Sequence, residues 1–393
     1  MDETRKELAK AKKLYQSKKY DESIGIYEKE YDENPDKFTI WDKRFYCWTI
    51  YYLHIRESEN EDELTESALQ VTQIIPQADL NKNPVCAYTL SVFRVIDYYN
   101  DLNDYLGLLD WAEKLNVELL DNKHKEYKGK ISESNKEKYY NRITKAYLEL
   151  KDYDSCIECS KQALESIDEF VKDNDIWYKW RLGKSLKEIG EYEEAIGYIK
   201  EVSDVKKDWY IDKEIADCYY FESDYENSLK YAVQAVLKKG DIDKKVNLYP
   251  IIRDLIKKDY PDEALKHDYL VYSIRFAKNW NIEDRLIEKI EEAGLDIENK
   301  NYNAIHKELI PFWKSLKYKN QELKYGTITK IFEHGNSGFI TSEDNEPFYF
   351  NTYDIVGDKS YLREYASVSF YTEKSFDKSK NKESLKAVNI EII

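Results

Sequence analysis

Apolar residues recur at intervals of three and four positions over most of residues 1–323, a pattern that predicts successive amphipathic α-helices separated by short polar turns. One turn sequence returns along this region: a polar pair, a tyrosine, acidic residues and then an apolar run. Its copies contain Tyr20, Tyr153, Tyr192, Tyr225 and Tyr260, with a weaker copy at Tyr105. The spacing is 33 residues from Tyr192 to Tyr225 and 35 residues from Tyr225 to Tyr260. Because a single helical hairpin cannot bury its apolar face alone, this period predicts a stack of hairpins.

Each copy carries the residue types that a helix–turn–helix unit needs. The tyrosine is expected to fill the crevice between the two helices, and the Asp or Glu after it complements the dipole of the second helix. A small residue three positions after the tyrosine lets the helices approach closely: Ser23, Cys156, Ala195 and Ser228. This pattern resembles the tetratricopeptide repeat family, which implies an α-solenoid. The resemblance is clear over about residues 4–37 and 137–280, while 38–136 reads as divergent helix pairs and 282–317 as terminal helices.

The pattern changes from helical to alternating at residue 324. Five short strands are predicted within about 70 residues, at 325–332, 338–341, 348–351, 366–371 and 385–393. Strands this short and this closely spaced favour a small barrel. The chain is therefore expected to be a multidomain α + β protein, with a helical array over 1–323 and a β domain over 324–393.

The β region also carries a specific resemblance. The run G-T-I-T-K-I-F-E-H-G-N-S-G-F-I-T-S-E-D is similar to the opening of a cold-shock domain, and Phe348-Tyr349-Phe350-Asn351 stands where the second RNA-binding motif of that family belongs. The resemblance implies a five-stranded OB-fold barrel that stacks unpaired bases on exposed aromatic rings. Strand alternation assigns six residues to the exposed face: Lys330, Phe332, Ser337, Phe339, Tyr349 and Asn351.

This chain departs from the cold-shock pattern at three of those positions. Lys330 replaces the family's tryptophan, Ser337 replaces the first aromatic residue of the first motif, and Asn351 replaces the histidine of the second motif. Phe332 restores a third ring two residues along the first strand. The nucleic-acid-binding residues implied by the resemblance are therefore Lys330, Phe332, Phe339, Tyr349 and Asn351.

The distribution of charge limits where nucleic acid could bind. The chain has a net charge of −16. Residues 324–393 hold nine basic and eleven acidic side chains and account for −2, which leaves −14 for the helical region. Attraction to phosphates needs clustered Lys and Arg side chains. The negative charge therefore excludes nucleic-acid binding over the whole surface, but it still allows a local binding site. Basic residues are concentrated in a predicted loop at 374–382. This loop could flank the phosphates of a bound strand, or it could be an ordinary solvated hairpin loop, and the sequence favours neither alternative.

The resemblance to tetratricopeptide repeats also implies a concave groove lined by the first helix of each hairpin. The matching positions are Asn141, Lys145, Trp180, Lys184 and Lys213. Such a groove would be locally basic and would accept an acidic peptide or a terminal carboxylate, because Lys and Asn both donate hydrogen bonds to carboxylates. The alternative is ordinary charge on helix surfaces.

Nothing in the sequence requires catalysis. The five histidines are scattered, and the chain has no phosphate-binding glycine loop, nucleophile motif or metal-spaced ligand set. Cys156 and Cys159 form a C-x-x-C, but this spacing within a helix favours two small core residues over a zinc or redox site. The few, scattered cysteines and the lack of a long apolar segment predict a cytoplasmic protein with no membrane partner, metal or cofactor.

Together these patterns lead to one hypothesis and two rivals. The hypothesis is a non-enzymatic adaptor that binds a protein through its helical array and single-stranded RNA or DNA through its β domain. The first rival is a protein-interaction scaffold or regulatory subunit whose β domain has lost nucleic-acid binding. The second is an enzyme whose site is assembled from distant residues.

Overall fold

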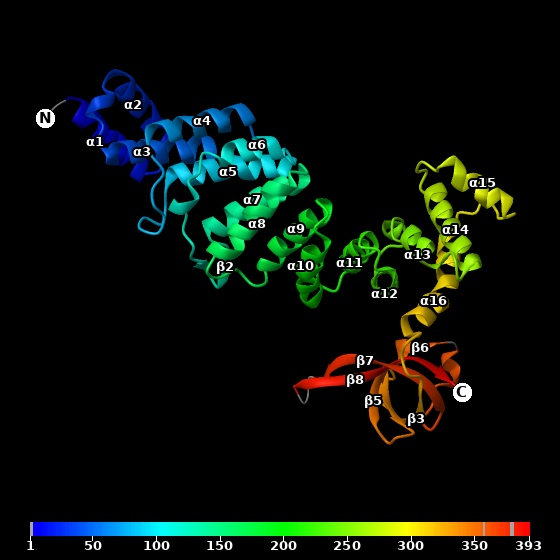
Figure 1. Cartoon of the computed structure of the whole chain (residues 1–393). Coiled ribbons are helices and arrows are strands. Elements are labelled where there is room, and N and C mark those ends of the chain that lie inside the picture. Colours follow the sequence, from blue (N-terminus) through cyan, green and yellow to red (C-terminus); the bar gives the residue numbers. More distant parts are fainter. Residues whose placement is uncertain (1–2, 357, 378–380) are drawn as a thin grey trace. The chain divides into compact units, whose positions relative to one another are not determined.

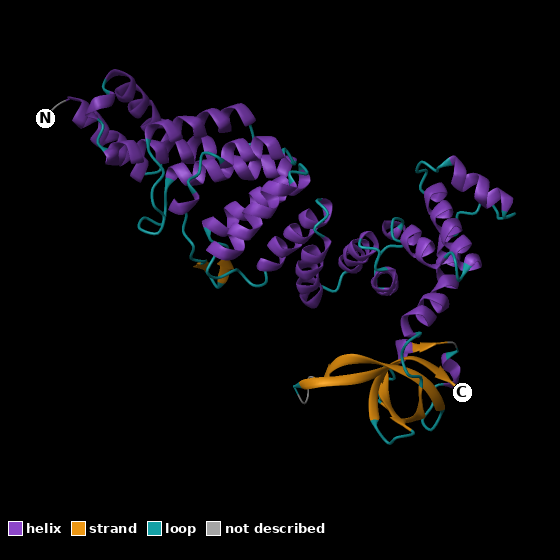
Figure 2. Ribbon diagram, in the orientation of Figure 1, coloured by secondary structure: helices purple, strands orange, loops and turns teal. Residues whose placement is uncertain are grey.

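The computed structural model of the protein describes residues 3–356, 358–377 and 381–393. The chain forms two compact units, residues 1–206 and residues 207–393. Figure 2 shows that the described residues of the first unit are mainly helical and that the second unit combines helices with a β-sheet. The first unit contains helices α1 (Glu3–Gln16), α2 (Tyr20–Glu33), α3 (Ile40–Ile50), α4 (Glu61–Ile74), α5 (Ala87–Leu102), α6 (Tyr105–Ala112), α7 (Asn135–Glu149), α8 (Tyr153–Ser166), α9 (Asp175–Glu188) and α10 (Tyr192–Val205).

Consecutive helices of the first unit pack in pairs, as the repeat predicts (Figure 1). Helix α1 packs on α2, α5 on α6, α7 on α8 and α9 on α10, and α8 also packs on α9. Two features inside 38–136 were not predicted. Helix α3 continues into a π-helical turn, Tyr51–Ile55, and a two-stranded hairpin, β1 (Lys125–Tyr127) and β2 (Lys130–Ser132), follows α6. Lys128 and Gly129 form its turn with φ of 51° and 73°, which suits a two-residue hairpin.

The repeated turns share one backbone geometry. The residue two positions before the repeated tyrosine has a left-handed φ at Lys18 (60°), Asn103 (57°), Lys151 (62°), Gly190 (90°) and Ser223 (64°). The next amide donates to the carbonyl five residues earlier, as Glu191 N–H does to Leu186 O at 2.9 Å. This is the Schellman motif, which satisfies the last carbonyls of the first helix and reverses the chain.

The small residue of each repeat lies at the crossing of the two helices. Ser23 and Ser228 are fully buried, and each donates its hydroxyl hydrogen to a carbonyl twelve residues earlier at 2.9 Å. The Cys156 thiol makes the equivalent bond to Thr144 O at 3.3 Å. The tyrosines are less enclosed than predicted, since Tyr225 is 56% exposed and the other copies are half-buried. Close helix approach therefore depends on the small residue, and the tyrosine covers the turn from outside.

The second unit begins with six helices that lead to the sheet. These are α11 (Trp209–Phe221), α12 (Tyr225–Leu237), α13 (Tyr249–Ile256), α14 (Pro261–Ala277), α15 (Asp284–Glu292) and α16 (Tyr302–Tyr318). Helix α16 packs against α12 and α14, and its Trp313 is completely buried there. The terminal helices predicted over 282–317 are thus present, and α16 encloses the core of the helical part of this unit.

The β domain is a six-stranded sheet with the order β5-β4-β3-β7-β8-β6. Its strands are β3 (Lys324–Ile331), β4 (Ser337–Ser342), β5 (Pro347–Asn351), β6 (Ile355–Val356), β7 (Ser367–Asp377) and β8 (Lys382–Ile392). An additional parallel pairing of β5 with β8 joins the two ends, so the five longer strands form a closed circuit of pairings (Figure 1). Buried Ile, Val, Phe and Ala side chains fill the interior.

The strands differ from the prediction in two respects. A sixth, two-residue strand, β6, pairs in parallel with β8. Residues 374–377 and Lys382, expected to lie in a loop, belong instead to the outer part of a long β7–β8 hairpin, with Lys374 opposite Leu385 and Phe376 opposite Glu383. The side chains of this extension are mainly polar, so the alternation of hydrophobic residues in the sequence does not predict it. Backbone hydrogen bonds between the two strands, rather than burial of side chains, stabilise the extension. Lys378, Ser379 and Lys380 of the basic region lie outside the described residues.

Candidate functional site

Strands β3, β4 and β5 bring three aromatic rings into one continuous row. Phe339 lies opposite Tyr349 in the β4–β5 register, and their ring centroids are 6.0 Å apart with planes at 76°. Phe332, directly after β3, lies 5.7 Å from Phe339 at 82°. Tyr349 is 37% exposed. The row therefore presents ring edges and faces side by side on one surface of the sheet.

A β-bulge places a cation beside this row. The β3–β4 register shifts between Ile328 and Lys330, so that Lys330 lies opposite Phe339. Alternation counted from Phe332 assigns Lys330 to the exposed face, as predicted, but alternation counted from the completely buried Ile328 would turn Lys330 to the interior. The bulge re-aims the side chain outward, and Lys330 Nζ lies 5.5 Å from the Phe332 centroid.

Gly338 makes the close approach of β3 and β4 possible. A Cβ at this position would lie 2.1 Å from Lys330 O and 2.7 Å from the Phe350 ring. Any side chain there would push the two strands apart. Position 338 therefore accepts only glycine. The close pairing of β3 and β4 that this glycine allows keeps the neighbouring Phe339 in the row of rings.

Sequence reasoning missed one member of the row. His334 lies in the β3–β4 turn, with its ring centroid 5.7 Å from that of Phe332. Its Nδ1 accepts a hydrogen bond from the Asn336 amide at 3.1 Å, which fixes the ring against the turn. Its position in the sequence, two residues after Phe332 in a predicted tight turn, could have indicated that the two rings lie close together. We call Lys330, Phe332, His334, Phe339 and Tyr349 the ring face.

The other two predicted residues are placed differently. Ser337 is 4% exposed and therefore offers no contact surface, in contrast to the prediction from alternation. Its position at the end of the turn explains this, because Phe332 N–H bonds Ser337 O at 3.0 Å and closes the turn over it. Asn351 supports the ring face from beside it, where its Oδ1 accepts the Tyr349 hydroxyl at 3.0 Å.

The β domain is attached to α16 through a packed junction. The rings of Tyr318 and Tyr371 stack with centroids 4.6 Å apart, and the Tyr318 hydroxyl donates to Glu373 at 3.1 Å. Lys317 pairs with the same carboxylate at 2.5 Å. Burial alone would raise the pKa of Glu373, but the hydrogen bonds from Lys317 and Tyr318 outweigh it and lower the pKa. These contacts fix the end of α16 against β7 of the β domain.

The predicted groove residues bond to their own neighbours. Asn141 Oδ1 accepts a hydrogen bond from half-buried Arg181 at 2.8 Å, and Lys145 donates to Asn100 at 3.1 Å. Lys184 Nζ lies 5.6 Å from the Trp180 ring. These residues belong to the first unit.

The fifth groove residue lies in the other unit. Lys213 forms an ion pair with Asp217 at 2.5 Å within α11. This charge is therefore neutralised by its own helix. Trp180 and Lys184 form a cation–ring contact within α9.

The described residues offer little for metal or thiol chemistry. No group of three or more His, Cys, Asp or Glu side chains among them is arranged to hold a metal ion. Cys156 is buried, and burial raises the pKa of Cys159 to about 11, so both thiols stay protonated near neutral pH. None of the described helices combines the length and apolar character needed to span a bilayer.

Comparison with known proteins gives weak structural similarities. No protein-family model matches the sequence, and no curated protein matches it. Similar solved structures include MamA (41-end) from Desulfovibrio magneticus RS-1 (14% identity, TM-score 0.39, 49% of this chain and 97% of that chain). Others are Pseudomonas aeruginosa PilF (11%, 0.37, 62% and 90%) and a tetratricopeptide repeat protein from Parabacteroides merdae (13%, 0.32, 73% and 97%). The description of this chain as a helical array similar to tetratricopeptide repeats rests on its own turns and packing.

Proposed function

We propose that this protein is a non-enzymatic, cytoplasmic adaptor. Its helical array binds a protein partner, and its β domain binds single-stranded RNA or DNA on the ring face. The observation that carries the nucleic-acid half of the proposal is the continuous row of Phe332, Phe339 and Tyr349 with Lys330 beside it.

The strand connectivity supports an OB-type, cold-shock-like barrel. The first three strands of the domain form an antiparallel meander, and the fifth long strand, β8, runs parallel to the third, β5, to close the circuit. This is the connectivity that an OB-fold barrel has. In such domains, exposed aromatic rings on the sheet surface stack unpaired bases. The ring face lies on the first three strands, where a cold-shock-like domain would present its rings.

The ring face favours single strands over duplexes. Base–aromatic stacking contributes about 1–3 kcal/mol per base, so three rings would supply about 3–9 kcal/mol before ordering costs. A duplex keeps its base faces stacked on each other and cannot use these rings. Because Lys330 is the cation seen on the face, few phosphates are neutralised. We expect the logarithm of affinity to fall with the logarithm of salt concentration with a slope of about −0.7, the value for one neutralised phosphate on a single strand.

One observation favours the rival function, a scaffold whose β domain no longer binds nucleic acid. Ser337 is buried at a position where the cold-shock family has an aromatic residue, and Lys330 stands in place of its tryptophan. The face thus has fewer rings than the family pattern implies. His334 adds one ring outside that pattern.

Titration of fluorescein-labelled single-stranded oligonucleotides, one RNA and one DNA, into the full chain tests the proposal. The Phe339→Ala/Tyr349→Ala variant should bind at least tenfold more weakly than wild type. The matched control is Phe221→Ala/Tyr225→Ala, which removes two exposed aromatic rings from the helical part of the same unit. Equal affinity of wild type and the ring-face variant, or no binding by either, would refute nucleic-acid binding and favour the scaffold.

The protein-binding half needs a separate test. Affinity purification of the full chain, with and without nuclease, should recover a protein partner that a Trp180→Ala/Lys184→Glu variant loses. Retention of the partner by this variant would place its binding site elsewhere on the array. A partner that disappears after nuclease treatment would instead be held through nucleic acid.

A further inference from the structure

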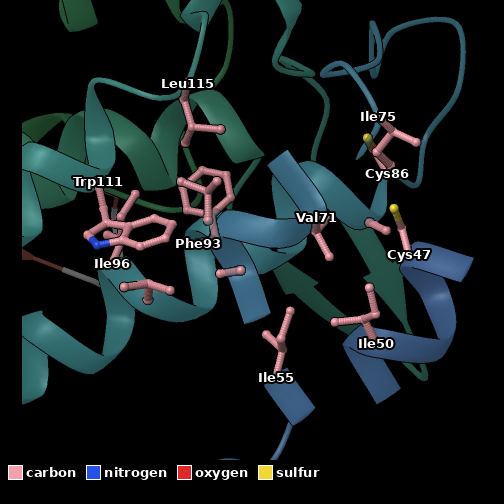
Figure 3. Packing of buried hydrophobic residues seen from close by; sticks show 14 of the residues in the cluster. Cys47, Ile50, Ile55, Val71, Ile75, Cys86, Phe93, Ile96, Trp111 and Leu115 are labelled. Atoms are coloured by element: carbon pink, nitrogen blue, oxygen red, sulfur yellow. The ribbon is translucent and has the colours of Figure 1, made fainter. Parts of the chain in front are cut away.

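One face of α3 carries a stripe of aromatic side chains. Trp41, Phe45, Trp48 and Tyr52 are spaced at i, i+4, i+7 and i+11, so they follow one side of the helix and its π-helical extension. The other side of the helix packs into the core of the first unit. Cys47 and Ile50 lie there among other apolar side chains, near Val71 of α4 (Figure 3). Phe45 and Trp48 of the stripe are half-buried against the same core, whereas Trp41 is exposed and core packing leaves its position unexplained.

The stripe borders two hollows in the first unit. The first has a volume of about 530 Å³ and lies between α3 and the α4–α5 connection; its lining includes Trp41, Trp48, Ile75 and Val85. The second has about 630 Å³ and lies between α1 and α3; Trp41 and Phe45 line both. Trp41 is 62% exposed and Val85 is 60% exposed, so two large apolar side chains are accessible at the first hollow. Hollows of this volume accept a peptide side chain with adjoining backbone.

The charges around the hollows are unbalanced in favour of an anionic ligand. Asp42 is paired with Arg5 at 2.7 Å, and Asp79 is paired with Lys82 at 2.9 Å. Burial alone would raise the pKa of Asp42, but hydrogen bonds from Arg5 and Thr39 outweigh it and lower the pKa. Both carboxylates that line the hollows are therefore already neutralised.

The two cations beside the stripe have aromatic rings as partners instead. The Arg44 guanidinium carbon lies 4.9 Å from the Trp41 ring, and Lys12 Nζ lies 4.6 Å from the Phe45 ring. Within the described residues, neither cation has a carboxylate within 4.0 Å. Helix α1, which supplies Lys12, holds five basic and two acidic residues in a chain of net charge −16. Positive potential is thus concentrated where the aromatic stripe is open.

We propose that these hollows bind an extended segment of a partner protein in which an apolar side chain is followed or preceded by an acidic residue. The apolar side chain enters between Trp41 and Val85, and the carboxylate pairs with Arg44 or Lys12. The proposal rests on the protein-binding role of the array and names the chemistry of one partner. Aliphatic lining such as Ile75 and Val85 favours a peptide over a nucleotide, whose base needs flat rings and hydrogen-bond partners.

An array of immobilised twelve-residue peptides tests this directly. Each peptide carries a central Leu, Phe or Trp, flanked by Asp and Glu, by Ser and Gly, or by Lys and Arg. The full chain should bind the acidic-flanked peptides, and Trp41→Ala/Arg44→Glu should reduce that binding at least tenfold. The matched control is Trp177→Ala/Lys206→Glu, which removes another exposed tryptophan with a cation 5.6 Å from its ring in the same unit. Arg44→Glu alone should also weaken binding while leaving the aromatic stripe intact.

Several results would overturn the proposal. The full chain could bind none of the peptides, or it could prefer peptides with Lys and Arg flanks. The matched control variant could also lose as much peptide binding as Trp41→Ala/Arg44→Glu. Weaker oligonucleotide binding by Trp41→Ala/Arg44→Glu with an intact ring face would assign the hollows to nucleic acid. Recovery of a partner by this variant, but not by Trp180→Ala/Lys184→Glu, would refute this site and leave the adaptor function standing.

Discussion

Acidification should destabilise the helical part of the second unit through His267. The side chain is completely buried on α14. Its Nδ1–H donates to the Glu263 carbonyl at 2.7 Å, which leaves Nε2 to accept the Trp313 Nε1–H at 2.9 Å. Protonation of Nε2 would place two N–H donors against each other inside the core. The structure therefore requires a neutral imidazole.

The size of the effect follows from the shift in pKa. Burial lowers the pKa of His267 to about 4, although Asp268 acts to raise it and Arg253 lowers it further. The unfolded state, with a pKa near 6.5, binds more protons than the folded state between about pH 4 and 6.5. Stability is thus complete above this interval and falls as the pH falls through it. Linkage gives a loss of about 2 kcal/mol from His267 between pH 7.5 and pH 5.

Urea unfolding of the full chain at pH 7.5 and pH 5 measures this loss. Because the chain has two compact units, the transition is fitted with two steps, and the near-ultraviolet circular dichroism of buried aromatic residues reports on each. The His267→Gln variant should be about 1–3 kcal/mol less stable at pH 7.5, since it disturbs a buried hydrogen bond. Between pH 7.5 and pH 5, the free energy of unfolding of this variant should fall by about 2 kcal/mol less than that of wild type.

A control separates this effect from general acid sensitivity. His54 is partly exposed and pairs with Glu63 at 3.0 Å, so His54→Gln should follow the wild-type pH profile closely in the second unit. Burial also lowers the pKa of His306 to about 4, so this residue contributes its own loss of stability on acidification. That contribution is the same in wild type and in both variants, and it cancels when their pH profiles are compared. Parallel pH profiles for wild type and His267→Gln would refute the reasoning.

Three further predictions concern packing, a buried cation and the β-domain junction. Gly183→Ala should destabilise the first unit by about 1–3 kcal/mol, measured by urea unfolding, because the new Cβ would lie 2.5 Å from Ile199; wild-type stability would contradict this. Burial lowers the pKa of Lys245 to about 8, so wild type should gain stability as pH rises from about 8 toward 10, and a Lys245→Met variant should lack this gain. Glu373→Gln removes the ion pair with Lys317 and should speed hydrogen exchange of β7 amides about tenfold; unchanged exchange would show that ring stacking alone holds the junction.

Local patterns in the sequence were sufficient to predict the helical array. The repeated turn encodes a Schellman motif, and Ser23 and Ser228 encode close helix crossings, because each depends on residues within one hairpin. The positions of the buried parts of the five longer strands were predictable for the same reason. Phe339 and Tyr349 could be placed on one face because they are paired directly on neighbouring strands.

Features that depend on contacts between distant residues could not be predicted from such patterns. The bulge that turns Lys330 outward, the burial of Ser337 and the addition of His334 to the ring face all arise from strand register and turn geometry. Polar residues concealed the long β7–β8 hairpin, which backbone pairing extends beyond the core.

The aromatic stripe of α3 illustrates the same division. Aromatic and apolar residues occur on several sides of this helix, so its sequence does not indicate which side is buried. Packing against α4 and α5 takes Cys47 and Ile50 into the core and leaves Trp41 exposed between two hollows. Periodicity in the sequence therefore specified the elements, because backbone hydrogen bonding and local burial are properties of short segments. The tertiary structure selected the surfaces, because exposure depends on which segments pack together.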